Sequence, residues 1–310
     1  MLRTFLPALL LISSACGSPE PNEASWSAWS PSVEPTHDGI SLYTLQDDTI
    51  PLRAWYARVD AGHPGVDISV VVAPDEDGRA SVSELAASTG ACLLVNAGYF
   101  RMDLDPSTHV GLLLSGGQLV HTATRGVYRD DLRYPVARAA IGFSASDVPS
   151  VGFVRTRSDS VFVLEGPPDN KPGTPAPEPE SNWMAWDVVD AVSGGPALLK
   201  DGMVAITTDE EVFFGTSIPK IHPRTAAGLT VDGDLILMVV DGRQSDSRGV
   251  SLEELALLMQ SAGAVTALNL DGGGSSTMVL DGTLVNRPTG GTFEREVVSA
   301  IAVHCSTPNP

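Results

Sequence analysis

The residues best suited to chemistry lie in one short run near the C-terminal end, TALNLDGGGSSTMVLDG (266–282). Asn269 and Asp271 end an apolar stretch two residues apart, so on a strand their side chains point to the same face. The glycines 272–274 that follow let backbone N–H groups approach a ligand without side chains in the way. The spacing predicts either a carboxylate beside an anion-binding loop or a tight turn that Asp271 merely caps.

Several better-known glycine loops do not fit this run. A P-loop needs Lys-Ser/Thr after its glycines and then a helix, whereas Ser275-Ser276-Thr277 leads into the strand-like MVLDG. A dinucleotide-binding loop fails for the same reason, and a nucleophile elbow lacks the last glycine of Gly-x-Ser-x-Gly. SIPK (217–220) matches Ser-x-x-Lys, but its proline prevents the helix that this motif begins. The six histidines show no metal-ligand spacing.

The elements that must position this run are mostly β-hairpins. Asp-Gly or Gly-Gly stands between apolar runs in LLLSGGQLV, LLKDGMVAI, LTVDGDLILMVV and MVLDGTLV, which is the strongest short-range hairpin signal. Two capping boxes predict helices that begin at residues 81 and 251 and end near glycines 90 and 263. Each helix leads into an apolar strand that ends in asparagine, at Asn96 and at Asn269.

These patterns predict an α+β (mixed α/β) fold of twisted, largely antiparallel sheets built from hairpins, with helices packed on them. RAAIGFSASD from Arg138 resembles RTAAGLTVDG from Arg224. Such echoes indicate either two similar sub-halves or two supersecondary units of a common type. The chain has 310 residues, 43% of them hydrophobic, which is enough for one large domain or two small ones.

The N-terminal segment predicts an exported protein of a bacterial cell envelope. Residues 1–16 combine Arg3, a short apolar stretch and the small-residue site SSAC, which indicates a signal peptide with a lipoprotein cysteine at Cys16. The alternative is a plain signal peptide with an incidental cysteine. With 38 acidic and 19 basic residues, the protein repels nucleic acid and anionic lipid, so we expect membrane association only through the lipid anchor.

Two segments differ in composition from the rest of the chain. Residues 17–36 are rich in Pro, Ser and acids and predict a disordered tether. Residues 166–181 have the same character and predict either a Pro-rich insertion at the surface of one body, 37–305, or a hinge between two halves. Export would permit a disulfide between Cys92 and Cys305, although two buried free thiols fit the sequence as well.

Four segments in order, NAGYFRM, SGGPALLKDG, HPRTAAGLTVDGDLILMVVDGRQ and NLDGGGSSTMVLDG, together resemble the phosphodiester glycosidase family. The resemblance runs from about Leu85 to His304, with a gap at the Pro-rich segment. EREVVSAIAVH also matches, with Glu296 where bacterial relatives commonly have proline. The resemblance carries over to these positions: Asn96, Gly98, Phe100, Arg224, Thr225, Asp241, Gly242, Asn269, Asp271, Gly272, Gly273, Gly274, Ser275 and Arg295.

Members of this family separate the anomeric carbon of a sugar from a phosphate oxygen. A phosphate monoester leaves more readily than a sugar hydroxyl, so such a site needs cations for phosphate and a carboxylate more than a strong general acid. The resemblance implies that Asp271, and after it Asp241, attacks C1 or activates water. It implies phosphate contacts from Arg224 and Arg295 and backbone donors from the glycine loop.

The remaining positions are expected to bind the sugar. Asn96 and Asn269 suit hydroxyl or acetamido groups, and Tyr99 or Phe100 either stacks on the sugar or belongs to the core. The substrate expected is a carbohydrate phosphodiester, handled without a cofactor. Two other classes stay open: a non-catalytic glycan-binding lipoprotein on the same fold, and a module whose acidic loops hold Ca²⁺.

Overall fold

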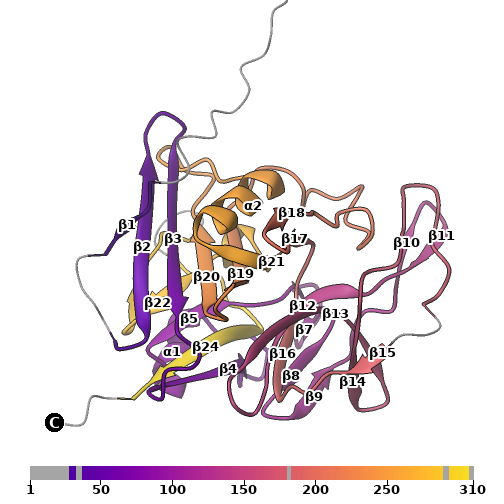
Figure 1. Cartoon of the computed structure of the whole chain (residues 1–310), viewed down its shortest axis with the longest axis horizontal. Helices are drawn as coiled ribbons and strands as arrows, with labels where there is room; N and C mark the ends of the chain where they lie inside the picture. The colour runs from indigo at the N-terminus through magenta and orange to yellow at the C-terminus, as the bar shows by residue number, and fades with distance from the viewer. Residues whose placement is uncertain (1–27, 33–36, 180–182, 289–292, 307–310) are drawn as a thin grey trace, which may run out of the picture.

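The computed structural model describes residues 28–32, 37–179, 183–288 and 293–306 (Figure 1). Every strand pair within these ranges is antiparallel, and the two α-helices are α1 (Val82–Thr89) and α2 (Leu252–Ser261). The expectation of largely antiparallel sheets is therefore confirmed. In the described part of the chain, no helix is long and apolar enough to cross a membrane.

The strands form three large sheets and two small ones. The eight-stranded sheet has the order β1 (Ser30–Pro31), β2 (Ile40–Asp47), β3 (Leu52–Val59), β20 (Leu235–Val240), β19 (Arg224–Thr230), β21 (Ala264–Asn269), β17 (Ala197–Lys200), β18 (Met203–Val204). The seven-stranded sheet has the order β15 (Trp183–Ala185), β14 (Ser160–Leu164), β13 (Pro149–Arg157), β12 (Arg138–Phe143), β16 (Asp190–Ser193), β8 (Leu113–Ser115), β9 (Gln118–His121). Strands β12 and β19, whose sequences echo each other, thus lie in different sheets.

The third large sheet is five-stranded. Its order is β23 (Thr283–Leu284), β22 (Met278–Leu280), β5 (Leu93–Asn96), β24 (Ser299–Cys305), β4 (Val66–Val72). The two-stranded sheets are β10 (Gly126–Arg129) with β11 (Leu132–Pro135), and β6 (Phe100–Arg101) with β7 (Thr108–His109). Hairpin β10–β11 extends away from the body on the right of Figure 1.

Turn chemistry explains the hairpins. Four of them have a two-residue turn in which both residues take positive φ, as a type I′ turn requires. The pairs are Gly116–Gly117 (φ 56° and 77°), Asp130–Asp131 (46° and 63°), Asp201–Gly202 (51° and 76°) and Asp281–Gly282 (49° and 71°). Both capping boxes are present. The hydroxyls of Ser81 and Ser251 accept from the N–H three residues on, and the glutamate carboxylate at that position accepts from the N–H of the serine.

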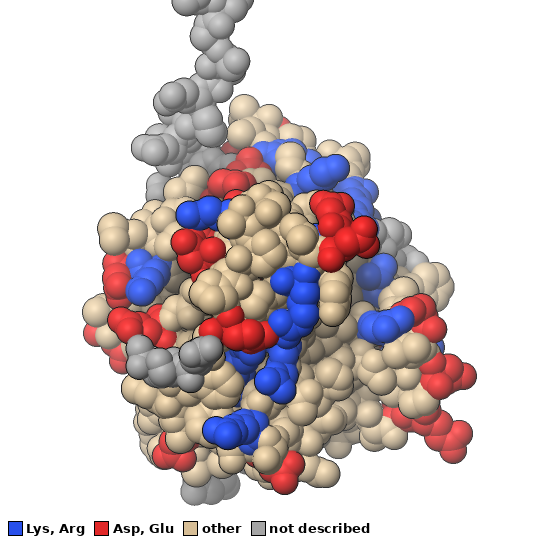
Figure 2. Space-filling model, turned by 90° about the vertical axis from the view of Figure 1, so that its right-hand side faces the viewer, with Lys and Arg blue, Asp and Glu red and all other residues tan. Residues whose placement is uncertain are grey.

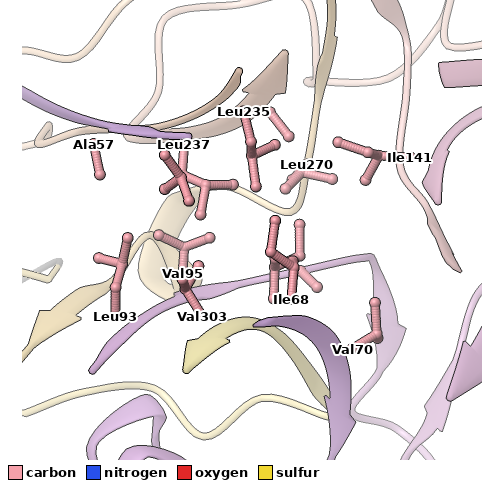
Figure 3. Close-up of a cluster of buried hydrophobic side chains, with 14 of the residues drawn as sticks. Ala57, Ile68, Val70, Leu93, Val95, Ile141, Leu235, Leu237, Leu270 and Val303 are labelled. Atoms are coloured by element: carbon pink, nitrogen blue, oxygen red, sulfur yellow. The ribbon is translucent and has the colours of Figure 1, made fainter. Parts of the chain in front are cut away.

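The main core lies where the three large sheets face one another (Figure 3). Alternation along the strands decides which side chains enter it: Leu93 and Val95 of β5 point into this core, whereas Leu94 packs with residues of α1. Buried residues of α2 share a separate cluster with β3, β19 and β20. Strand ends from the three large sheets therefore lie at the edge of this main core.

Two segments differ from their predicted character. The tether prediction for 17–36 is wrong for residues 28–32, because Ser30–Pro31 pairs with β2 and the Trp29 ring packs edge-on against Tyr56. In residues 166–179, the described part of the Pro-rich insertion, there is no helix, yet Asn170 is fully buried. The Asn170 amide donates to the carbonyl oxygens of Pro135 and Glu210, which fixes the insertion to the body.

Covalent features complete the fold. A disulfide joins Cys92, next to β5, to Cys305 at the end of β24, with the two Cα atoms 5.8 Å apart. His37 lies beside the disulfide. Within the described ranges, these three side chains are close enough to one another, and of the right types, to be considered as ligands of a metal ion. Because the two sulfurs are bonded to each other, the group offers a single imidazole ligand. The proposed lipid site, Cys16, lies outside the described residues.

Candidate active site

Strand ends from all three large sheets meet at one place. Asn96 is the last residue of β5, and Asn269 is the last residue of β21. Between β16 and β17, the Gly195 N–H donates to the Asn269 carbonyl at 2.7 Å, and the Gly194 N–H donates to the carbonyl of Ala139 in β12 at 2.9 Å. The sequence similarity between the two strands that end in asparagine thus has a structural counterpart, because the last residues of both strands lie at this junction.

Asn96 holds the junction together. Its Oδ1 accepts from the Thr225 hydroxyl at 2.7 Å and from the Thr277 N–H at 3.1 Å, and its Nδ2 donates to the Asp271 carbonyl at 2.6 Å. Asn96 and Thr225 are fully buried. This geometry differs from the sugar contact expected for them, because partners within the protein already occupy the Asn96 amide and the Thr225 hydroxyl. They position Asp271 instead.

Asp271 presents its carboxyl group to the junction. Its backbone is fixed on both sides, since its N–H donates to Ala97 and its carbonyl accepts from Asn96, while the residue remains partly exposed. Burial raises the pKa of the Asp271 carboxyl to about 6, against the opposing effects of the nearby Ser275 hydroxyl and the Arg295 guanidinium. A carboxyl with this pKa is ionised near neutral pH and can still take a proton during a reaction.

The glycine run forms the wall beside Asp271. Residues Gly273–Ser275 make a short 3-10 turn, η2, which begins with Gly273 at φ 66°. A Cβ on Gly274 would stand only 2.5 Å from Arg295 Nη2, so the exposed Arg295 guanidinium lies directly against the loop. Arg243, also exposed, reaches the same loop near Gly273. Both guanidinium groups therefore lie against the glycine loop, and the Arg295 charge acts on the Asp271 carboxylate.

Arg243 is a site residue that sequence reasoning missed. It follows the Asp-Gly of the VVDGRQ segment, and its φ of 59° is unusual for a residue with a side chain. Its Nη2 donates to Nδ1 of His222 at 3.0 Å. A basic residue immediately after a matched family motif was the available signal.

Arg224 lies beneath the glycine loop rather than facing a substrate. It is 2% exposed, its Nε donates to the Val250 carbonyl, and its Nη2 donates to the carbonyls of Ile218 and Lys220. Burial lowers its pKa to about 10. Carbonyl oxygens thus accept from Nε and Nη2 of Arg224, which fixes the 218–220 loop to this side chain; the phosphate contact expected of Arg224 stays a prediction.

Groups within the protein also occupy the Asp241 carboxylate. It is 3% exposed, and its carboxylate accepts from Asn286 Nδ2 at 2.8 Å and from the Arg287 N–H at 3.1 Å. Asn286 Nδ2 also donates to the Ser276 carbonyl, so Asp241 supports the far side of the glycine loop. Burial raises the pKa of Asp241 to about 6. This geometry favours Asp271 over Asp241 as the reacting carboxylate. Asn286 carried no sequence signal.

Asn269 and Tyr99 line the junction opposite the loop. Asn269 Nδ2 donates to the Tyr99 hydroxyl at 2.7 Å and to the Leu270 carbonyl at 2.7 Å, and the Tyr99 hydroxyl donates to the Gly195 carbonyl at 2.8 Å. Asn269 Oδ1 is buried and accepts no hydrogen bond from the described part of the chain. Burial raises the pKa of Tyr99, and the negative charge of Asp271 adds to this rise. Tyr99 and Asp271 are thus electrostatic neighbours.

Two of the predicted sugar contacts serve packing. Phe100 packs against the cluster that contains the buried face of α1, so Tyr99, not Phe100, belongs to the site. A Cβ on Gly98 would stand 2.3 Å from Nε2 of His109 and 2.5 Å from the Ser193 carbonyl, so Gly98 permits close packing. Burial lowers the pKa of His109 to about 3, so this imidazole is neutral at physiological pH.

Comparison with known proteins shows which family the chain resembles. The model of the phosphodiester glycosidase family matches residues 89–304. The N-acetylglucosamine-1-phosphodiester alpha-N-acetylglucosaminidase of Bos taurus is 28% identical over 277 residues, which are 84% of this chain and 44% of that protein. The Mus musculus protein of the same name is 28% identical over 249 residues, 74% of this chain and 41% of its own length. The chain thus spans less than half the length of these relatives.

Solved structures share the fold. The catalytic domain of the zebrafish enzyme of that name, described as auto-inhibited by its pro-peptide, superposes with a TM-score of 0.59 at 23% identity, covering 89% of this chain and 88% of that one. A hypothetical protein from Synechocystis gives a TM-score of 0.61 at 19% identity, covering 87% of this chain and 62% of that one. Because the family model covers well over half of its residues, the chain belongs to the phosphodiester glycosidase family.

Proposed function

We propose that this protein hydrolyses the bond between C1 of a sugar and a phosphodiester oxygen in a surface or environmental glycoconjugate. The observation that carries the proposal is the Asp271 carboxyl, which is partly exposed, has a raised pKa, and lies beside a glycine loop that bears Arg243 and Arg295. This combination supplies what the reaction needs: a carboxylate for C1 or its water, and positive charge for the departing phosphate.

In the proposed reaction, Asp271 either attacks C1 or removes a proton from the attacking water. The C1–O bond breaks, and its electron pair leaves with the phosphate monoester, which gains negative charge. Arg295, exposed on the glycine loop, offsets that charge, and Arg243 adds to the local potential. Water supplies the hydroxyl that remains on the sugar, and the other proton goes to the carboxylate or to solvent.

For the sugar we propose an N-acetylated hexosamine. The relatives from Bos taurus and Mus musculus are named for N-acetylglucosamine 1-phosphodiesters. Asn269 Oδ1, an acceptor without a partner in the described ranges, suits the acetamido N–H of such a sugar, and Tyr99 adjoins it. We further propose that the N-terminal signal exports the protein and that Cys16 carries a lipid anchor, which labelling with a fatty-acid analogue would test in a Cys16→Ser variant.

The test is a panel of sugar 1-phosphodiesters assayed for free sugar. Asp271→Asn should abolish most turnover, whereas Asp159→Asn, the same change of charge in an exposed turn, should not. If the wild-type protein releases no sugar from any member of the panel, the proposal is rejected. Binding without release would favour the glycan-binding alternative, and loss of turnover on chelation would favour the calcium-dependent one.

A further inference from the structure

We infer that His222 is a positioning residue for Arg243: its imidazole accepts a hydrogen bond from the guanidinium and holds it against the glycine loop without neutralising its charge. The inference rests on the proposed function and deepens it, because it names the group that keeps one of the phosphate-binding cations in place. Arg243 Nη2 donates to Nδ1 of His222 at 3.0 Å. A Cβ on Gly273 would stand 3.5 Å from the same Nη2 atom, so one guanidinium group joins the imidazole to the loop.

The two contacts of the His222 ring define its protonation state. Nε2 lies 2.8 Å from the Ser217 carbonyl oxygen, which can only accept, so Nε2 carries the proton and donates. Nδ1 faces the Arg243 guanidinium, which can only donate, so Nδ1 is unprotonated. Both bonds exist together only in the neutral ring with its proton on Nε2. An imidazolium has no acceptor atom, so protonation of His222 would break its bond to Arg243.

The surroundings of His222 favour the neutral ring. Burial lowers the pKa of His222, and the hydrogen bond to the Ser217 carbonyl acts in the opposite direction. The positive charges of Arg224, Arg243 and Lys220 lower this pKa further. These cations face the ring from β19, from the segment after β20 and from the loop that carries His222 itself. The ring is therefore an uncharged acceptor at neutral pH.

The backbone fixes where both side chains begin. The His222 N–H and carbonyl pair with Val250 at 3.1 Å and 3.0 Å. A Cβ on Gly249 would stand 2.4 Å from the His222 carbonyl oxygen, and a Cβ on Gly242 would stand 2.8 Å from the Gly249 Cα, so these segments pack closely. Arg243 follows with a φ of 59°, which is rare for a residue with a side chain. Such a backbone persists where surrounding contacts hold it, which points to a need for this side-chain direction.

An imidazole holds a guanidinium differently from a carboxylate. Arg58 contacts Asp234 and Arg248 contacts Glu254, each at 2.6 Å, and acidic and basic side chains are interspersed over the face shown in Figure 2. Among the described residues, Arg243 has no carboxylate within 4.0 Å, although acids outnumber bases two to one in the chain. A carboxylate would fix the guanidinium and offset its charge. The neutral imidazole fixes it and leaves that charge available to a substrate anion.

A cation held in this way suits the leaving phosphate of the proposed reaction. Arg243 is exposed, and its guanidinium offers further N–H donors beside the one that Nδ1 accepts. As the C1–O bond breaks, the phosphate gains negative charge next to the glycine loop. A guanidinium that is already in place stabilises this charge without having to reorganise. His222 thus acts through Arg243, and its ring needs no contact with the substrate.

The experiment measures the Kd of N-acetylglucosamine 1-(methyl phosphate) by calorimetry in the Asp271→Asn protein, where turnover does not interfere. Adding His222→Leu removes the acceptor and should raise Kd about tenfold, as Arg243→Gln should, and both together should raise it no further. His222→Asn has the shape of leucine but places an amide oxygen near the position of Nδ1, so it should keep most of the affinity. Arg157→Gln, a change of charge on the exposed end of β13, should leave Kd unchanged. If the diester binds but His222→Leu and His222→Asn behave alike, the inference is rejected.

Nitrogen-15 NMR of histidine-labelled protein tests the contact without any substrate. At pH 7 the spectrum of His222 should show a protonated Nε2 and a bare Nδ1, and Arg243→Gln should shift the Nδ1 resonance, whereas Arg157→Gln should not. These results would support the positioning role even if the protein neither binds nor hydrolyses a sugar 1-phosphodiester, an outcome that rejects the proposed function alone. A protonated Nδ1, or an Nδ1 resonance that Arg243→Gln leaves in place, overturns the inference.

Discussion

Replacing Asp271 by Asn should make the protein more stable at neutral pH while it removes activity. The folded protein holds the Asp271 carboxyl at a pKa of about 6, raised by burial, against about 3.9 for an aspartate in an unfolded chain. The folded state therefore binds the proton more tightly, so ionising this group destabilises the fold. Asparagine has nearly the same shape and no charge to bury, so it avoids that penalty.

The size and sign of the effect follow from linkage. A difference of about two pKa units corresponds to about 3 kcal/mol at full ionisation, and partial exposure of Asp271 reduces the expected gain to about 2 kcal/mol. Between about pH 4 and pH 6 the folded wild-type protein holds a proton that the unfolded chain has released, so its stability falls as pH rises through this window. The advantage of Asp271→Asn is thus absent below about pH 4 and complete above about pH 7.

The assay is urea unfolding of both proteins at intervals from pH 4 to pH 8, beside kcat/KM on a sugar 1-phosphodiester. We expect turnover to fall roughly 10²–10⁴-fold. Asp241→Asn is the matched control, because its carboxyl also has a raised pKa but accepts bonds from Asn286 and Arg287 that an amide satisfies poorly, so it should gain less stability. A stability difference that is independent of pH, or a less stable Asp271→Asn protein at pH 8, would refute this reasoning.

Four further changes test the site and its supports. Arg295→Gln should lower kcat/KM roughly tenfold without a measurable change in Tm, because the side chain is exposed and acts on the phosphate; equal losses of both would contradict this. Gly274→Ala should reduce turnover more than stability, since its Cβ displaces the Arg295 guanidinium. Asn96→Ala removes three hydrogen bonds and should cost about 3 kcal/mol in urea unfolding. The double change Cys92→Ser and Cys305→Ser should cost about 3–5 kcal/mol, as should a reductant in a thermal melt.

Local rules predicted the elements well. The Asp-Gly and Gly-Gly turns, such as Asp201–Gly202, demand positive φ and so fix both the turn type and the antiparallel pairing. The two capping boxes fixed the starts of α1 and α2. The arrangement of the strands into three sheets was not predictable in this way. Pairings such as β3 with β20 join residues far apart in sequence, and nothing local encodes them.

The site was predicted as a set of positions but not as a set of roles. The glycine run, Asp271 and Arg295 lie close together, and their roles in a reaction stay predictions. Arg224 was expected to bind phosphate because an arginine in a family motif suggests a ligand, but which atoms it bonds depends on the loop at 218–220, which folds over it. In the sequence, Arg138 stood out only because the segment that it begins resembles the segment that begins at Arg224. Its place near Tyr99 depends on how two different sheets meet.

What distinguishes reacting groups from supporting groups here is hydrogen-bond satisfaction. Burying a polar side chain is unfavourable unless partners replace water, and Asn96 and Asp241 have such partners within the protein. Their full pairing holds the glycine loop rigidly. Asn269 Oδ1 is buried without a partner in the described ranges, and the partly exposed Asp271 carboxyl has a raised pKa because burial is not fully compensated. At this junction, Asn269 Oδ1 is therefore where a substrate N–H would complete the bonding, and the paired groups around it are what keep that place fixed.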